Sequence, residues 1–161
     1  DPANAARLGV DTKRIAIAGH SMGGWVTAHT AAHDRGLIGA ILISAADLGY
    51  MAGAPREKLA AIMADNMESL AGVTAQSMAD EVIANAKAFS LDDSVGGLTQ
   101  TPLLVLSADD GLAPGTDKLV KAIEAAGGQK VTAIHAATDH GWSDHRIFLE
   151  STIINWLAGL K

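Results

Sequence analysis

The chain has 161 residues, of which 48% are hydrophobic and only 4% aromatic, a composition that fits one globular domain with an aliphatic core. Its net charge of -6 argues against nucleic acid or an anionic membrane as a partner, because both bind clustered lysine and arginine. It contains no cysteine, which excludes disulfides, thiolate nucleophiles and cysteine-based zinc sites.

Four short apolar runs predict the strands of a parallel sheet. Each is apolar on both faces, as expected when helices cover both sides of a sheet. The runs are Arg14–Ala18, Ile38–Ser44, Leu103–Ser107 and Val131–His135. Helical patterns lie between them, so the sequence predicts an α/β fold with a parallel β-sheet flanked by helices.

The predicted helices have recognisable ends. Asp1 and Pro2 are typical of a helix start, and Gly9 of the residue after a helix. Other helices are expected from Met22 to about His33 and over Lys118–Ala126. The last helix is expected to begin near Ser143 and to direct three side chains inward, namely Ile147, Ile154 and Leu157.

The segment 45–101 is too long for a simple crossover between two strands. It carries two amphipathic patterns, one from Pro55 through Met67 and Leu70, and one after Thr74 that continues to Ala86 and Phe89. We predict one domain over 1–161, with 45–101 as a helical cap inserted above the sheet edge. Ordinary packing layers would explain the same pattern equally well.

A strand, the motif Gly-x-Ser-x-Gly and a helix follow one another around Ser21. A tight turn between strand and helix exposes a serine hydroxyl at the carboxyl end of the sheet, as a nucleophile requires. The helix N-terminus offers N–H groups to a developing oxyanion. We expect Gly19 and Gly23 to be glycine because side chains there would collide across the turn.

A serine nucleophile needs a base and an acid that orients the base. Asp109 and Asp110 follow the third predicted strand, and we favour Asp110 because it directly precedes Gly111. His140 lies in the loop after the fourth strand, where it can reach back over the sheet. The sequence therefore predicts Ser21, His140 and Asp110 as nucleophile, base and acid, with Asp109 as the second choice for the acid.

These motifs resemble the α/β-hydrolase family, in particular bacterial serine esterases and prolyl-oligopeptidase-like hydrolases. The similarity rests on RIAIAGHSMGG at Arg14–Gly24, DDGLAP at Asp109–Pro114 and DHGW at Asp139–Trp142. It implies a Ser21 nucleophile, an oxyanion N–H from Met22, and acyl transfer to water through an acyl-enzyme. It implies no cofactor.

Members of this family place several strands before the nucleophile, and a loop after one of them supplies the second oxyanion donor. This chain has room for one helix and one strand before Ser21. We therefore expect a fragment or a reduced member of the family that holds its second half. The Arg14–Ala18 strand would then form an open sheet edge, which predicts a homodimer through that edge.

Other chemical signals are discounted. His29 and His33 share a helix face but lack a following glutamate and a third ligand, so a structural role is expected and no metal site is predicted. His20 is expected to pack or hydrogen-bond at the turn. Capping of the last helix by Ser143 or Asp144 explains the acidic residues near His140. Three residues after the second strand are candidates for an acyl pocket or for ordinary packing: Leu48, Tyr50 and Met51.

The predicted function is a serine hydrolase of carboxylic esters acting on a small molecule. Two alternatives remain open: a serine peptidase of the prolyl-oligopeptidase type, and a non-catalytic half-domain that needs a partner to complete its sheet. A dinucleotide-binding function is excluded because the glycines after the first strand do not follow the G-x-G-x-x-G spacing.

Overall fold

The computed structural model describes residues 1–67 and 70–160. Its sheet has four parallel strands in the order β1-β2-β3-β4, which is also their order in the chain. The strands are β1 (Ile15–His20), β2 (Leu37–Ile43), β3 (Leu103–Ala108) and β4 (Val131–Ala136). The predicted parallel α/β sheet is confirmed, and each strand end lies within two residues of its expected position.

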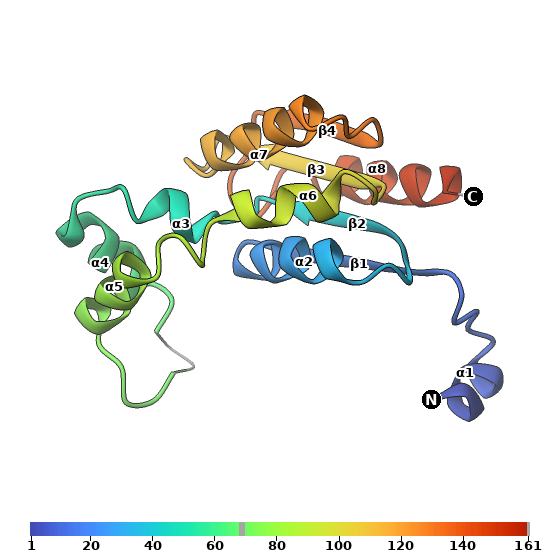
Figure 1. Ribbon diagram of the computed structural model, residues 1–161, viewed down its shortest axis with the longest axis horizontal. Coiled ribbons are helices and arrows are strands. Elements are labelled where there is room, and N and C mark those ends of the chain that lie inside the picture. The colour runs from blue at the N-terminus through green and yellow to red at the C-terminus, as the bar shows by residue number, and fades with distance from the viewer. Residues whose placement is uncertain (68–69, 161) are drawn as a thin grey trace.

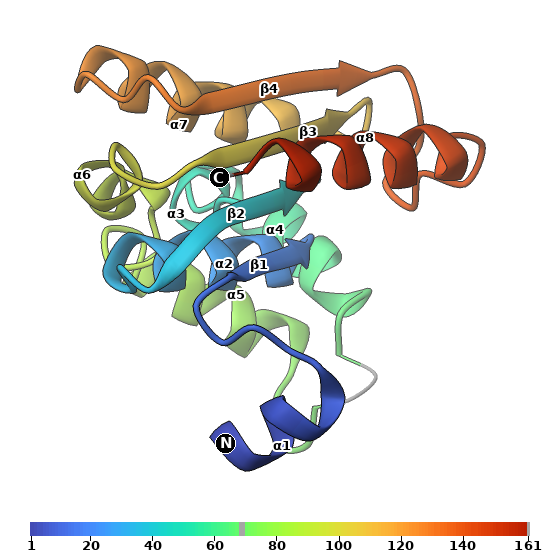
Figure 2. The ribbon, with the colours of Figure 1, turned by 90° about the vertical axis from the view of Figure 1, so that its right-hand side faces the viewer.

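Helices cover the two faces of the sheet unequally (Figures 1 and 2). One face carries α2 (Met22–His33), η1 (Leu91–Ser94), α6 (Val95–Leu98) and α7 (Ala113–Ala125), whereas the other carries α8 (Arg146–Gly159). As a result β3 is buried throughout, but β1 and β4 keep exposed positions. The expectation that all four strands are buried on both faces is therefore wrong for the two edge strands.

The inward face of α8 differs from the prediction. Ile147 and Ile154 are 84% and 55% exposed. The side chains that pack against the sheet are Leu149, Ile153, Trp156 and Leu157. These four recur at the helical spacing of three and four residues, and Ile147 stands about 200° around the helix from Leu149. Of the three predicted inward residues, only Leu157 is correctly placed.

The segment between β2 and β3 divides into two parts. α3 (Leu48–Met51), α4 (Arg56–Ala64) and α5 (Ala75–Ala84) extend beyond the carboxyl ends of the strands and are here called the cap (Figure 1). The cap has its own buried cluster, which includes Leu59, Met63 and Val82. η1 and α6 instead return to the side of α2.

Two helices of the cap, α4 and α5, are shorter than predicted. α4 ends at Ala64, so Met67 lies outside it and Leu70 is 52% exposed, while residues 68 and 69 of the predicted helix lie outside the described residues. α5 begins after Thr74 as expected, with a capping box between Thr74 and Ser77, but ends at Ala84 before Phe89. Phe89 still packs against the cap cluster.

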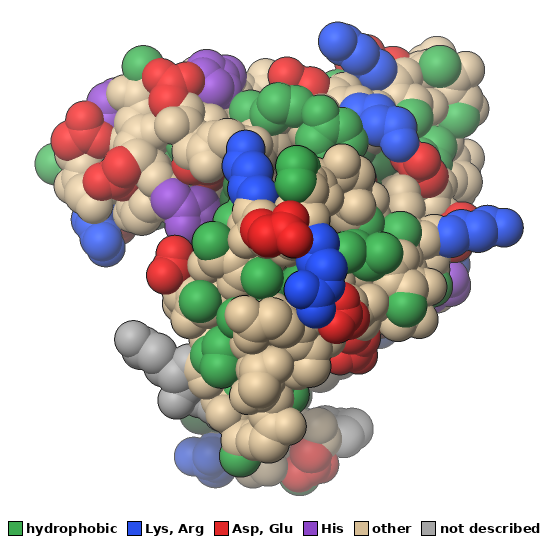
Figure 3. All heavy atoms as spheres, turned by 90° about the vertical axis from the view of Figure 1, so that its left-hand side faces the viewer, with side chains coloured by type: hydrophobic (Ala, Val, Ile, Leu, Met, Phe, Trp, Pro, Cys, Tyr) green, Lys and Arg blue, Asp and Glu red, His purple; other side chains and the backbone are tan. Residues whose placement is uncertain are grey.

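The short first helix, α1 (Pro2–Leu8), has the predicted ends, with Asp1 at its N-cap and Gly9 at its C-cap with φ 67°. None of the helices within the described residues is long and apolar enough to cross a membrane. On the face shown in Figure 3, lysine and arginine side chains are interspersed with acidic and hydrophobic ones.

α2 and α6 meet at backbone distance, which gives a direct test of the packing. A Cβ atom at Gly97 would lie 2.1 Å from the carbonyl oxygen of Ala32, whereas one at Gly96 would meet nothing within 4 Å. We predict that Gly97→Ala lowers the free energy of unfolding by about 1–3 kcal/mol or more, because the helices must separate. Gly96→Ala is the matched control and should unfold at the wild-type urea concentration. Equal midpoints for the two variants would contradict the described helix contact.

Candidate active site

Ser21 forms the turn between β1 and α2 with strained backbone angles, φ 56° and ψ -120°. Its N–H donates to the carbonyl oxygen of Ile43 at 2.9 Å, and its own carbonyl accepts from the N–H of Ala46 at 3.1 Å. Both backbone groups of Ser21 are therefore held by the end of β2. The hydroxyl makes no capping bond to α2, which leaves it available for chemistry.

The glycines around Ser21 do not act as predicted in every case. A Cβ at Gly19 would lie 2.0 Å from the carbonyl oxygen of Gly23, so the expected collision at Gly19 is confirmed. A Cβ at Gly23 would meet nothing within 4 Å, so the expectation for Gly23 is wrong. The second close approach occurs at Gly24, where a Cβ would lie 2.5 Å from the Cβ of Ala45.

This contrast can be tested by alanine substitution. Gly19→Ala should disrupt the turn and lower the thermal unfolding midpoint by several degrees, because backbone atoms on both sides cannot move apart cheaply. Gly23→Ala should keep or slightly raise the midpoint, since alanine favours the helix that begins there. The check is differential scanning calorimetry of both variants. A larger loss for Gly23→Ala would refute the turn geometry.

The predicted acid and base are in contact. His140 Nδ1 donates to Asp110 Oδ2 at 2.8 Å, and the side chain of Asp110 is only 2% exposed. Asp110 Oδ1 accepts a second bond from the N–H of Leu112 at 2.9 Å. The His140 side chain remains 43% exposed, so its other ring nitrogen is free of the acid and accessible to a substrate.

The neighbouring carboxylate belongs to a different array. Asp109 Oδ1 accepts from His135 Nε2 at 2.9 Å, and His135 Nδ1 lies 3.0 Å from the hydroxyl of Ser107. Ser107 is itself buried between the strands. Asp109 therefore engages the β4 histidine, whereas Asp110 engages the loop histidine, as the favoured prediction requires.

Two residues that the sequence did not single out support the acid. The Ser44 hydroxyl accepts from Trp142 Nε1 at 3.1 Å, and it helps to lower the pKa of the Asp110 carboxyl. Ser44 directly follows β2 and has φ 42°, and Trp142 is 1% exposed with φ 55°. A serine at the end of a strand gives no signal of its own in the sequence.

The loop that carries His140 is held by side chains on both sides. Asp139 accepts from the N–H of Ser143 at 2.9 Å, and Asp144 accepts from the Thr138 hydroxyl and lies 2.9 Å from His145 Nδ1. α8 begins only at Arg146 with no side-chain cap, so the predicted capping by Ser143 or Asp144 is wrong. These acidic residues instead fix the loop.

His20 supports the same loop from β1. Its Nε2 donates to the carbonyl oxygen of His140 at 2.7 Å, and the two rings lie 4.5 Å apart between centroids. This agrees with the expected hydrogen-bonding role of His20 at the turn. Asp110 thus positions the ring of His140, and His20 positions the backbone of His140.

One cavity of about 450 Å³ brings the candidate residues together. Ser21, Met22, Asp110 and His140 all line it, and the cap closes its other side. Leu48 and Met51 also line this cavity, whereas Tyr50 lines an adjacent one. In the described residues the N–H of Met22 has no hydrogen-bond acceptor, so it can donate to an oxyanion beside Ser21.

The Ser21 hydroxyl makes no hydrogen bond to His140 within the described structure. Such catalytic hydrogen bonds often form or shorten only when substrate is bound. The acid and the base are therefore held in contact with each other, and the serine lines the same cavity.

The carboxylate of Asp110 is tuned by opposing effects. Burial raises its pKa, but the hydrogen bonds from His140, Leu112 and Ser44 outweigh burial and hold the pKa below its usual value. Asp110 therefore stays ionised at neutral pH, as an acid that orients an imidazole must.

By contrast, burial lowers the pKa of His29, which bonds to Ser94 at 3.0 Å and keeps a structural role.

The Ser44 bond can be tested through acid unfolding. Because the folded pKa of Asp110 is depressed, its contribution to stability is present above about pH 4 and is lost as the pH falls through the folded value. Ser44→Gly removes one donor yet tolerates the positive φ, so the folded pKa should rise and unfolding should begin at higher pH. Tryptophan fluorescence follows the transition, and Ser151→Ala, on the exposed side of α8, is the control. An unchanged acid midpoint would argue against the bond.

Potential metal ligands are not grouped. His33 donates to the carbonyl of His29 at 2.8 Å, in keeping with the expected structural role of this pair. Across residues 1–67 and 70–160, no three histidine, aspartate or glutamate side chains are placed to hold a metal ion.

The carboxyl edge of a parallel sheet thus carries a serine at a strained turn after one strand, and an acid and a histidine after later strands. A family model described as alpha/beta hydrolase fold matches residues 2–144. The chain therefore belongs to the α/β-hydrolase-fold family. No curated protein sequence matches it.

Solved structures share the fold at low sequence identity. The acylaminoacyl peptidase of Pyrococcus horikoshii has a TM-score of 0.73 and 16% identity over 99% of this chain. A fungal esterase from Rhizomucor miehei has a TM-score of 0.68 and 19% identity over 99% of this chain. An α/β hydrolase from Vibrio vulnificus has a TM-score of 0.57 and 26% identity over 94% of this chain. The chain spans 26%, 55% and 51% of the lengths of these three structures.

Proposed function

We propose that this chain is the part of a serine hydrolase that carries the nucleophile, and that the reaction is the cleavage of carboxylic esters. The observation that carries the proposal is the 2.8 Å bond between Asp110 and His140 on the cavity that Ser21 also lines. The acid fixes the imidazole tautomer so that Nε2 is the basic nitrogen.

The proposed steps follow from these positions. His140 Nε2 takes the hydroxyl proton of Ser21 as Oγ attacks the ester carbonyl, and the N–H of Met22 stabilises the oxyanion. His140 then protonates the leaving alcohol, which leaves an acyl group on Ser21. Water, deprotonated by His140, releases the acid and restores the serine. No cofactor takes part in this scheme.

Three substitutions test the assignment of roles. Ser21→Ala and His140→Ala should each lower kcat/KM for a 4-nitrophenyl ester by about 10⁴-fold or more, and Asp110→Asn by about 10²–10⁴-fold. Asp109→Asn is the matched control, because Asp109 bonds to His135 instead of His140. Equal losses from the two aspartate changes would overturn Asp110 as the acid.

Labelling separates an assembled nucleophile from a folded but inactive half-domain. A fluorophosphonate should modify Ser21 stoichiometrically, as read by intact mass and peptide mapping, and His140→Ala should abolish the modification. No labelling of a folded sample would favour the half-domain that needs a partner. Comparing esters with the matching peptide amides then distinguishes an esterase from a peptidase.

A further inference from the structure

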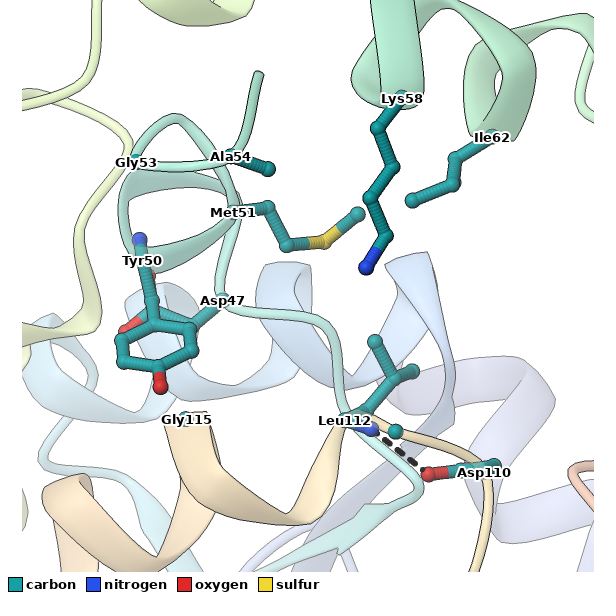
Figure 4. Close-up of a pocket in the computed structure, with 11 residues that line it drawn as sticks. Asp47, Tyr50, Met51, Gly53, Ala54, Lys58, Ile62, Asp110, Leu112 and Gly115 are labelled. Atoms are coloured by element: carbon teal, nitrogen blue, oxygen red, sulfur yellow. Dashed lines mark hydrogen bonds between the residues drawn. The ribbon is translucent and has the colours of Figure 1, made fainter.

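A second cavity, of about 640 Å³, continues from the Ser21 cavity beneath the cap (Figure 4). The two cavities share four lining residues, Met51, Ile62, Asp110 and Leu112. The wall they share is mainly apolar, so a ligand held at Ser21 can extend an aliphatic chain past Met51 and Ile62. The cleft is therefore longer than a simple acetyl ester needs.

Lys58 is the one lysine or arginine among the described residues that line these two cavities. Its side chain comes from α4 and extends into the cavity, with the ammonium group between the ends of Met51 and Ile62 and facing Leu112 (Figure 4). Lys58 is an exposed residue, so its side chain is open to solvent as well as to the cavity. An ammonium beside an apolar wall favours a ligand whose chain ends in a negative charge.

Within the described residues Lys58 has no carboxylate at ion-pair distance, in contrast to two nearby cations. Arg56 pairs with Asp80 at 2.6 Å, and Lys118 pairs with Asp92 at 2.7 Å. Arg56 is two residues from Lys58 on α4, so the two side chains point to different sides of the helix. The ion pair of Arg56 with Asp80 therefore lies on the side away from Lys58. The charge of Lys58 is therefore available to a ligand.

The carboxylates that face the cleft are already engaged or lie elsewhere. Asp110 accepts bonds from His140 and Leu112, and Asp47 accepts from the N–H groups of Tyr50 and Leu91 while 3% exposed. Asp65 is at the opposite end of α4 and lines the Ser21 cavity. It disfavours an anion there, so the negative end of a ligand should lie at Lys58.

We propose that Lys58 binds a carboxylate at the far end of the acyl chain, so that the preferred substrates are monoesters of short dicarboxylic acids. The proposal rests on the proposed serine-hydrolase function and names its substrate class. The cleft would then hold the ester carbonyl at Ser21, the methylene chain along the apolar wall shared by the two cavities, and the free carboxylate beside the ammonium group.

Kinetics provide the first test. The substrates are mono-4-nitrophenyl adipate and its methyl ester, which differ by one negative charge. Wild type should prefer the anionic ester, and Lys58→Met should lower the ratio of the two kcat/KM values by about five- to tenfold. Raising the salt concentration should shrink the wild-type preference, because the site is open to solvent. Lys121→Met removes one charge from an exposed position on α7 and should keep the ratio.

Binding provides a test that does not require turnover. Monomethyl adipate and dimethyl adipate are titrated into Ser21→Ala protein and followed by NMR, with and without Lys58→Met. Tighter binding of the monoanion that is lost with Lys58→Met supports the proposal. Equal binding of the two ligands, or a preference that survives Lys58→Met, overturns it.

The two tests separate the two proposals. A wild-type chain that hydrolyses neither ester contradicts the proposed function, while the titration still decides the role of Lys58. A chain that hydrolyses both esters with a ratio independent of Lys58 keeps the proposed function and overturns the carboxylate subsite.

Discussion

The site depends on the way in which each strand end is tied to the next. The N–H of Ser21 donates to Ile43 at the end of β2, and the N–H of Ser44 donates to Leu106 in β3 at 2.8 Å. The N–H of Asp109 in turn donates to Thr138, in the loop after β4, at 3.1 Å. These bonds continue the parallel register beyond the strands. The residues that follow β1, β3 and β4 are thereby set at fixed heights above one edge of the sheet.

Backbone strain is concentrated at the same edge. Within the described residues, three non-glycine positions have positive φ: Ser21, Ser44 and Trp142. Ser21 is the candidate nucleophile, Ser44 lowers the pKa of Asp110, and Trp142 lies in the loop that carries His140. Each of the three is held by hydrogen bonds to a neighbouring segment. Strain of this kind persists only where the surrounding structure fixes it, and it is common at functional sites. The rigid sheet supports these conformations, while the cap supplies the opposite wall.

Much of this arrangement can be read from the sequence, because its signals are local. The apolar runs fix the strands, and Gly-x-Ser-x-Gly after a strand fixes the turn at Ser21. The choice between Asp109 and Asp110 is harder, because a shift of the turn by one residue would exchange the directions in which their side chains point. Here the bond from Asp109 N–H to Thr138 sets that rotation, and it joins segments that the sequence does not show to be neighbours.

The features that cannot be predicted from the sequence depend on contacts between residues that are far apart in the chain. Ser44 and Trp142 are 98 residues apart, and only the fold brings them together. α5 is overpredicted because its apolar pattern continues to Phe89, which packs against the cap cluster from beyond the helix end. α4 is overpredicted because the pattern continues to Leu70, which is 52% exposed. The phase of α8 is wrong because its apolar residues are spread around the helix, so the sequence pattern alone does not mark the side that meets the sheet.

The separate core of the cap has an evolutionary consequence. Its buried residues form a cluster distinct from the two clusters that hold the sheet and its flanking helices. Substitutions in the cap can accumulate with few compensating changes beneath the strands, as long as the cap cluster stays filled and Trp25, which packs against both clusters, is kept. Lineages with the same catalytic edge can therefore diverge in the ligands they accept through drift and selection in a few dozen cap positions.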